Sequence, residues 1–229
     1  MVSNNMIIAF DLEGTLVDGE LLPAIGDELG IRQKLEALTA QARDGEVGFA
    51  SSLSQRIELI RGTSIHRVND ISMELPLQRG ALEAVDQVRQ LGAHPIIITG
   101  GFNVLAGQIA RRLGVKYVAS NRFIVENGRI EGVMTPILDE QEKRLKLTAL
   151  ASWLGVPMQR CVAIGDGAND VPMLKAAGLG IGFGDRECVR CADEVVTSGD
   201  LRDIIPLIRD HLESTHTLNL SYPKTVTVP

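Results

Sequence analysis

The chain has 229 residues, of which 45% are hydrophobic and 3% aromatic, and its formal net charge is −6. This length allows one large or two small domains with an apolar core, so the fold should need no disulfides. The acidic charge balance argues against a nucleic-acid surface, because phosphate backbones are held mainly by Lys and Arg.

The predicted elements alternate between apolar runs of strand length and amphipathic stretches of helix length. We expect strands at Met6–Phe10, Pro95–Thr99, Lys116–Ala119, Cys161–Ile164, Leu179–Phe183 and Glu194–Val196. We expect helices at Gly80–Leu91, Val104–Leu113, Lys143–Leu154, Asp170–Ala176 and Leu201–Leu212. Such alternation predicts an α/β fold with a parallel sheet.

Residues 17–76 break this alternation, because they contain only helical patterns. These fall at Leu21–Leu29, Ile31–Arg43, Phe49–Arg61 and Ser64–Ile71. An all-helical block after the first strand resembles a lid over a site. We therefore expect a core of residues 1–16 and 77–213, a helical cap of residues 17–76, and a tail of residues 214–229 that is either disordered or an arm pairing with another surface.

The N-terminus and the cysteines predict a soluble, cytoplasmic protein. The first residues, M-V-S-N-N, lack a basic region and lead directly into a short strand, unlike a signal peptide or a membrane span. The three cysteines have no framework spacing and should be reduced thiols. Cys188 and Cys191 form C-x-x-C, but no further Cys or paired His completes a zinc site.

Two acidic loops follow predicted strands. D-L-E-G-T-L-V-D begins at Asp11 after the run I-I-A-F, and G-D-G-A-N-D runs from Gly165 to Asp170 after a second apolar run. Because α/β enzymes place their chemistry at the carboxyl ends of strands, Asp11 and Asp166 should converge on one site. Two converging carboxylates suit a hard divalent cation.

These motifs, in this order, resemble the haloacid dehalogenase superfamily and, within it, the phosphoserine phosphatase family, over most of residues 6–212. The resemblance implies a Rossmannoid parallel-sheet core with an inserted helical cap. It also implies Mg²⁺-dependent phosphoryl transfer through an aspartyl-phosphate, with a small phosphorylated metabolite as the partner. We expect no nucleic-acid or membrane partner, and either a monomer or a homodimer.

The resemblance assigns the central reaction to the first acidic loop. Asp11 is the expected nucleophile, since a carboxylate can attack phosphorus and leave an acyl-phosphate that water cleaves. Glu13, where most members carry Asp, is the expected general acid and base. The implied Mg²⁺ ligands are Asp11, Asp166 and the backbone carbonyl of Glu13.

Two further motifs are implied to hold the phosphate. Thr99, where the family usually has Ser, follows an isoleucine-rich strand and precedes Gly100 and Gly101, whose bare backbone can approach an anion closely. Lys143 matches the family lysine that neutralises phosphate charge. Lys146 lies one turn along the same helix face; one of the two lysines should point inward, and the spacing before Asp166 favours Lys143.

The remaining implied residues orient the substrate. In the last motif, Asn169 resembles a substrate contact and Asp170 a carboxylate that holds the metal water or the lysine. Glu20 and Arg56 fall at positions that grip the amino and carboxylate groups of serine, and Phe49 matches a position that shields the site.

The substrate stays open between several candidates. O-phosphoserine is the first expectation, but Arg43 stands where close relatives often have Met, and a second cation could favour a more acidic substrate. The alternatives are phosphothreonine, phosphohomoserine or a sugar phosphate, transfer to an alcohol instead of water, or a phosphate-binding protein that Glu13 has made catalytically weak. The alternating glycines after Ala177 lack the G-x-G-x-x-G fingerprint of a dinucleotide site.

Overall fold

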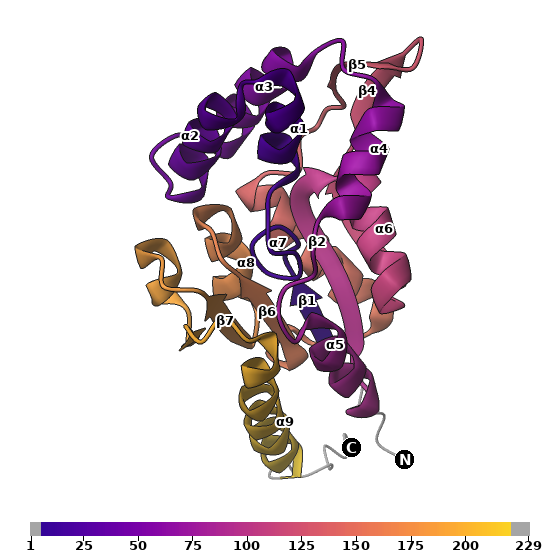
Figure 1. Cartoon of the computed structure of the whole chain (residues 1–229). Helices are drawn as coiled ribbons and strands as arrows, with labels where there is room; N and C mark the ends of the chain where they lie inside the picture. Colours follow the sequence, from indigo (N-terminus) through magenta and orange to yellow (C-terminus); the bar gives the residue numbers. More distant parts are fainter. Residues whose placement is uncertain (1–5, 221–229) are drawn as a thin grey trace, which may run out of the picture.

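The structure is a computed structural model and describes residues 6–220; for Arg43 and residues 216–220 it describes the backbone. A six-stranded sheet lies at its centre, with neighbouring strands in the order β3-β2-β1-β6-β7-β8 (Figure 1). The strands are β1 (Ile7–Phe10), β2 (His94–Phe102), β3 (Tyr117–Asn121), β6 (Cys161–Gly165), β7 (Leu179–Phe183) and β8 (Glu194–Val196). Every pair in this sheet is parallel, which confirms the α/β prediction.

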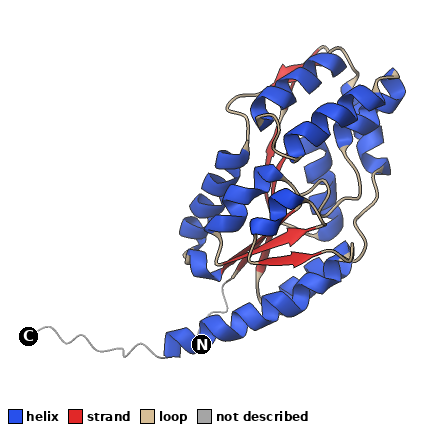
Figure 2. Cartoon of the chain, turned by 90° about the vertical axis from the view of Figure 1, so that its left-hand side faces the viewer, coloured by secondary structure: helices blue, strands red, loops and turns tan. Residues whose placement is uncertain are grey.

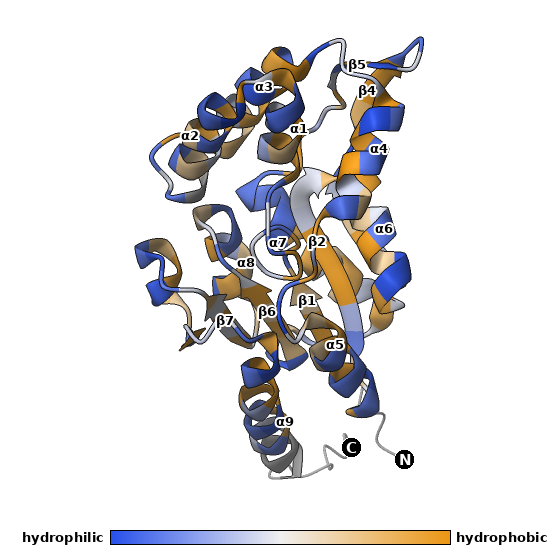
Figure 3. Cartoon of the chain, in the orientation of Figure 1, coloured by the Kyte–Doolittle hydropathy of each residue, from blue (hydrophilic) through white to orange (hydrophobic). Residues whose placement is uncertain are grey.

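Helices cover both faces of the sheet (Figure 2). They are α5 (Ala81–Gln90), α6 (Asn103–Leu113), α7 (Glu140–Leu154), α8 (Val171–Ala176) and α9 (Ile204–Leu220). Ile8 and Phe10 pack with α5, α6 and α9 in one core cluster, whereas Ile7 and Ala9 pack with α7 and α8 in another. Because successive strand residues point to opposite faces, both faces of β1 must be apolar. Hydrophobic residues accordingly dominate the middle of the sheet (Figure 3).

The register of the central strands places the ends of β1 and β6 at nearly the same level. Phe10 lies opposite Ile97 of β2 on one side and Ile164 of β6 on the other. The next residue, Asp11, donates its amide to the carbonyl of Ile164 at 2.9 Å. The acidic loop after β1 is therefore fixed beside the loop after β6.

Four helices lie over this edge of the sheet, and we call them the cap (Figure 1). They are α1 (Leu21–Leu29), α2 (Arg32–Arg43), α3 (Phe49–Ile60) and α4 (Ile65–Glu74). A hairpin of β4 (Phe123–Glu126) and β5 (Arg129–Val133) joins them, because the amides of Gly62 and Ile65 donate to the carbonyls of Ile130 and Gly128 at 2.8 and 2.9 Å. The hairpin falls in the segment that the sequence assigns to the core, yet it extends the cap.

The two linkers between cap and core pair with each other. Asp18 donates its amide to the carbonyl of Pro76 at 3.0 Å, and Gln78 donates its amide to the carbonyl of Leu16 at 2.9 Å. The cap thus enters and leaves the core at one narrow place, which suits rotation about the paired linkers.

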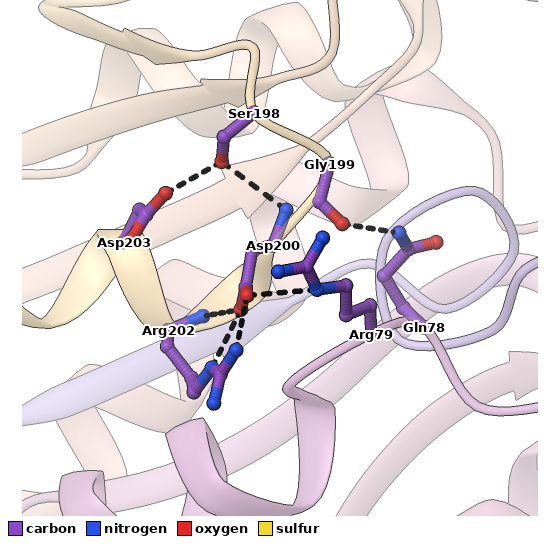
Figure 4. A network of polar contacts seen from close by, with 7 residues as sticks. All are labelled: Gln78, Arg79, Ser198, Gly199, Asp200, Arg202 and Asp203. Carbon is purple, nitrogen blue, oxygen red and sulfur yellow. Dashed lines mark hydrogen bonds and ion pairs between the residues drawn. The ribbon is translucent and has the colours of Figure 1, made fainter.

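A polar network anchors the returning linker on the core (Figure 4). The Gln78 side chain donates to the carbonyl of Gly199 at 2.9 Å, and Asp200 accepts from Arg202 at 2.9 Å and pairs with Arg79 at 3.0 Å. The hydrogen bonds from Arg202 hold the pKa of Asp200 below its usual range. These contacts fix the core side of the linker.

Helix α9 ends at Leu220 and not at Leu212, so the expected end of the last helix was wrong. The segment carries polar residues that break the apolar period, but Ser214 donates its hydroxyl to the carbonyl of His211 at 2.9 Å and remains helical. Residues 221–229 lie outside the described residues, as does the expectation of disorder or an arm there. Within residues 6–220, none of the helices has the length and apolar character needed to cross a membrane.

Candidate active site

A buried lysine lies between two carboxylates at the carboxyl end of the sheet. Lys143 of α7 is fully buried, and its Nζ donates to Asp11 Oδ1 and to Asp170 Oδ1, each at 2.7 Å. Burial alone would lower the pKa of Lys143, but the two carboxylates outweigh it and raise that pKa above its usual value. Burial and the charge of Asp11 raise the pKa of Asp170 to about 6. The lysine is therefore a permanent cation behind Asp11.

The second candidate lysine points outward. Lys146 has a side chain that is 52% exposed, and it pairs only loosely with Glu142, at 3.8 Å. Helix α7 begins at Glu140, three residues before the expected start, because Asp139 caps it by accepting from two backbone amides. Lys143 consequently lies in the first turn and faces the sheet.

Asp166, at the end of β6, lies against the backbone of the first acidic loop. A Cβ atom on Gly14 would stand 2.3 Å from Asp166 Oδ2, so only glycine allows this approach. Carboxylate oxygens of Asp11, Asp166 and Asp170 lie within 4.8 Å of one another. Asp170 has both oxygens engaged, because Lys143 donates to Oδ1 at 2.7 Å and the Gly167 amide donates to Oδ2 at 3.1 Å, whereas Lys143 binds Asp11 through Oδ1 alone. The residues that fit a hard divalent cation best are therefore Asp11 and Asp166.

Glu13 turns back over the same site. Its Oε1 accepts the backbone N–H of Leu21, the first residue of α1, at 2.6 Å. Its Oε2 lies 2.2 Å from the place where a Cβ atom on Gly101 would stand. Burial, followed by the charge of Asp11, raises the pKa of Glu13 to about 7. This carboxyl can exchange a proton near neutral pH.

The T-G-G motif lies inside β2, which continues to Phe102 and not merely to Thr99 as expected. The pairing with β3 shifts register between Ile98 and Phe102, and the carbonyl of Gly100 accepts from the Asn121 side chain at 2.8 Å. Thr99 Oγ1 accepts a hydrogen bond from the amide of Gly101 at 2.9 Å. A Cβ atom on Gly100 would lie 2.4 Å from the Phe49 ring of the cap. The motif thus offers a hydroxyl and close backbone at the cavity wall.

A cavity of about 50 Å³ separates cap and core. Ten of the site residues expected from the sequence line it: Asp11, Glu13, Glu20, Phe49, Arg56, Thr99, Gly100, Gly101, Asp166 and Asn169. Lys143 and Asp170 lie behind Asp11 and are fully buried. The structure describes only the backbone of Arg43, so the interpretation of its side chain lies outside the described residues.

Arg56 brings a buried cation to the cap wall of this cavity. It is 5% exposed, and burial lowers its pKa while the charges of Glu20 and Glu13 act in the opposite direction. Its Cζ lies 5.7 Å from the centre of the Phe49 ring. Among the described residues, the structure gives its Nη2 atom no hydrogen-bond partner. A buried guanidinium with a free donor is suited to an anionic group of a ligand.

Two polar residues at the site escaped the sequence reasoning. Thr39 of α2 lines the cavity and accepts a hydrogen bond from Arg56 Nη1 at 3.1 Å. Arg186, after β7, lies 3.5 Å from Asp166 Oδ2 and 3.3 Å from Asp44 Oδ1 at the end of α2, so it connects core and cap. No local motif marks either residue, because the first contact depends on how α2 packs on α3 and the second on how the cap sits on the core.

Several known proteins are similar to this chain. A family model described as haloacid dehalogenase-like hydrolase matches residues 6–178. The chain is 34% identical over 216 residues to a phosphoserine phosphatase of Albidiferax ferrireducens, with 91% of each chain covered. It is 38% identical over 185 residues to a phosphoserine phosphatase of Mycobacterium tuberculosis, but there the match spans 80% of this chain and only 45% of the relative.

Solved structures show the same fold. A structure described as a phospho-aspartyl intermediate analogue of phosphoserine phosphatase has a TM-score of 0.86 and 32% identity, covering 89% of this chain and 99% of that one. A substrate-bound phosphoserine phosphatase complex also has a TM-score of 0.86, with 31% identity and coverage of 89% and 98%. The architecture of core and cap is shared over nearly the whole of those proteins.

Proposed function

We propose that this chain, which belongs to the haloacid dehalogenase-like hydrolases and within them to the phosphoserine phosphatase family, hydrolyses O-phosphoserine to serine and phosphate. The observation that carries the proposal is the small cavity between core and cap, whose core wall holds Asp11 and Asp166 and whose cap wall holds Glu20 and Arg56. One wall has the groups for phosphoryl transfer, and the other has one cation and one anion for an amino acid.

Asp11 is the proposed nucleophile. Its carboxylate attacks phosphorus in line and the serine oxygen leaves, so the phosphoryl group passes to Asp11 and afterwards to water. Lys143 supports this placement, because its ammonium is held 2.7 Å from Asp11 Oδ1 and offsets the charge that phosphate and carboxylate bring together. Asp170 holds the lysine from its other side at 2.7 Å.

Glu13 is the proposed general acid and base. A carboxyl whose pKa is raised to about 7 carries a proton often enough to give it to the leaving serine oxygen, and it can then take one from the attacking water. The Leu21 amide fixes one oxygen of Glu13 at 2.6 Å and leaves the other for the substrate. The contact also links the acid to the start of the cap.

Thr99, Gly100, Gly101 and Asn169 are proposed to contact the phosphate, since all four line the cavity. A divalent cation, which we propose to be Mg²⁺, would be held by Asp11, Asp166 and the Glu13 carbonyl, and it would supply positive charge to screen the phosphate from the nucleophile. The acidic groups within 4.8 Å support this assignment.

The cap is proposed to recognise the amino-acid part. Arg56 would bind the carboxylate through its partnerless Nη2 atom, and Glu20 would bind the ammonium, while the ring of Phe49 covers the phosphate end. The cavity has room for only a few water molecules, so a substrate enters when the cap moves about its paired linkers.

A substrate panel tests the proposal. Phosphate release is measured from O-phosphoserine, O-phosphothreonine, O-phosphohomoserine and a sugar phosphate, with Mg²⁺ and with a chelator, and for an Asp11→Asn variant. We expect release from O-phosphoserine to dominate, to need Mg²⁺ and to vanish in the variant. Equal rates on all four esters would discard the serine assignment, and a fully active Asp11→Asn variant would discard the mechanism.

A further inference from the structure

The guanidinium of Arg56 is the proposed contact for the substrate carboxylate. The residues that fix the plane of this guanidinium therefore affect how tightly the substrate binds. Arg56 Nε lies 3.3 Å from the carbonyl of Ser52, one turn back on α3, and Nη1 lies 3.1 Å from Thr39 Oγ1 on α2. The first contact belongs to the same helix. The second comes from the neighbouring helix, and it fixes the far end of the side chain.

Thr39 is well suited to hold this cation. It is 5% exposed, it lines the same cavity, and its β-branched side chain has only two main χ1 rotamers in a helix, so its hydroxyl loses little freedom when it accepts from Arg56. A hydroxyl oxygen accepts from Nη1 without adding a charge that would compete with a ligand carboxylate. The Nη2 donor stays free for that ligand.

The two helices are tied together at the same level. The Ser52 hydroxyl donates to the carbonyl of Leu38, next to Thr39, at 2.9 Å, and Ser52 itself is buried. α2 therefore cannot slide along α3 without breaking this bond, and the distance between Thr39 and Arg56 is kept. Both contacts lie inside the cap, so they persist when the cap moves as a unit.

We propose that Thr39 is a positioning residue for substrate recognition: its hydroxyl orients the Arg56 guanidinium so that the fork meets the substrate carboxylate with little rearrangement. This inference rests on the proposed function. An ordered guanidinium loses less conformational freedom when it binds a carboxylate. Removing the Thr39 hydroxyl should therefore weaken the binding of substrates that carry a carboxylate and leave the binding of other substrates unchanged. Loss of a hydrogen bond to a charged group corresponds to about a 10- to 100-fold drop in kcat/KM.

The experiment compares Thr39→Val, which keeps the shape and removes the hydroxyl, with Thr39→Ser, which keeps the hydroxyl. Each variant is assayed on O-phosphoserine and on two esters without a carboxylate, O-phosphoethanolamine and p-nitrophenyl phosphate. We expect Thr39→Val to lose about 10- to 100-fold in kcat/KM on O-phosphoserine, mainly through KM, and less than about threefold on the other two. Thr39→Ser should restore most of the loss.

A control for the same substitution is Thr148→Val on α7, an exposed residue outside the cavity lining whose hydroxyl donates to the carbonyl of Arg144. It should change none of the rates by more than about twofold. If Thr39→Val fails to fold, Thr39→Ala gives the same comparison of substrates. An equal loss on all three esters, or no loss on O-phosphoserine, overturns the positioning role. A wild-type enzyme that does not hydrolyse O-phosphoserine overturns the proposed function instead.

Discussion

Replacement of Lys143 by methionine tests the electrostatic centre of the site. Methionine keeps an unbranched apolar stem but removes the ammonium that Asp11 and Asp170 share at 2.7 Å. Both carboxylates are then buried beside each other without that cation. Breaking a buried ion pair by removing one partner typically costs about 3–5 kcal/mol of the free energy of unfolding.

The cost should depend on pH, because a proton can replace the lost cation. In the wild type, burial and Asp11 already raise the pKa of Asp170 from 3.8 to about 6, and Lys143, together with the Gly167 amide, keeps it from rising further. A carboxyl with a raised folded pKa binds protons more tightly when folded, so stability falls as pH rises between the unfolded and folded values, by about 3 kcal/mol for this shift. In the variant the folded pKa of Asp170 should be higher still, so the pH range over which stability falls extends to higher pH.

The deficit of Lys143→Met relative to the wild type should therefore grow between about pH 5.5 and pH 8, by about 1.4 kcal/mol for each further unit of pKa shift. Urea unfolding without metal at the two pH values measures it. Lys146→Met is the control, since that side chain is 52% exposed, and it should cost less than about 0.5 kcal/mol. Equal deficits at both pH values, or a deficit no larger than that of the control, would refute the reasoning.

Three further predictions concern the remaining groups of the site. Gly101→Ala places a Cβ about 2.2 Å from Glu13 Oε2 and should lower kcat at least about tenfold. Gly107→Ala is the control, because its Cβ would lie 3.8 Å from the nearest atom, and it should leave kcat unchanged; equal kcat values for the two variants would contradict the close approach. Because the pKa of Glu13 is raised to about 7, the rate of phosphoryl transfer should fall as pH rises through that value, and Glu13→Gln should lack this limb in stopped-flow measurements. Arg186→Gln removes a cation 3.5 Å from Asp166 and should tighten Mg²⁺ binding about three- to tenfold by calorimetry; an unchanged Kd speaks against any competition.

The sequence was most informative where chemistry coincides with a strand end. Asp11 and Asp166 follow apolar runs, and parallel strands bring such residues to one edge whatever the details of packing. The apolar period of α7 left Lys143 and Lys146 open. In the structure Lys143 shares the buried face of α7 with Leu147 and Ala151, and Lys146 does not.

Contacts between side chains of different elements were beyond the sequence. Thr39 and Arg56 lie on different helices, and nothing in the pattern of α2 indicates which of its polar residues faces α3. Arg186 follows β7 in a loop with many charged residues, and its contact with Asp44 exists only because α2 ends above it. Both are tertiary contacts between elements whose sequence separation gives no periodic signal.

The glycines of the motifs are needed mainly because acidic side chains lie against their backbone. Cβ atoms on Gly14, Gly101 and Gly165 would lie 2.2 to 2.3 Å from the side chains of Asp166, Glu13 and Asp170. Each of these acids therefore lies directly against bare backbone, where water cannot surround it. For Glu13 and Asp170, the same closeness that needs glycine also removes solvent and raises the pKa, to about 7 and about 6. The close approach of the glycine backbone therefore affects both the position and the pKa of the carboxyl. A methyl group at Gly101 should change the pKa of Glu13 as well as its position.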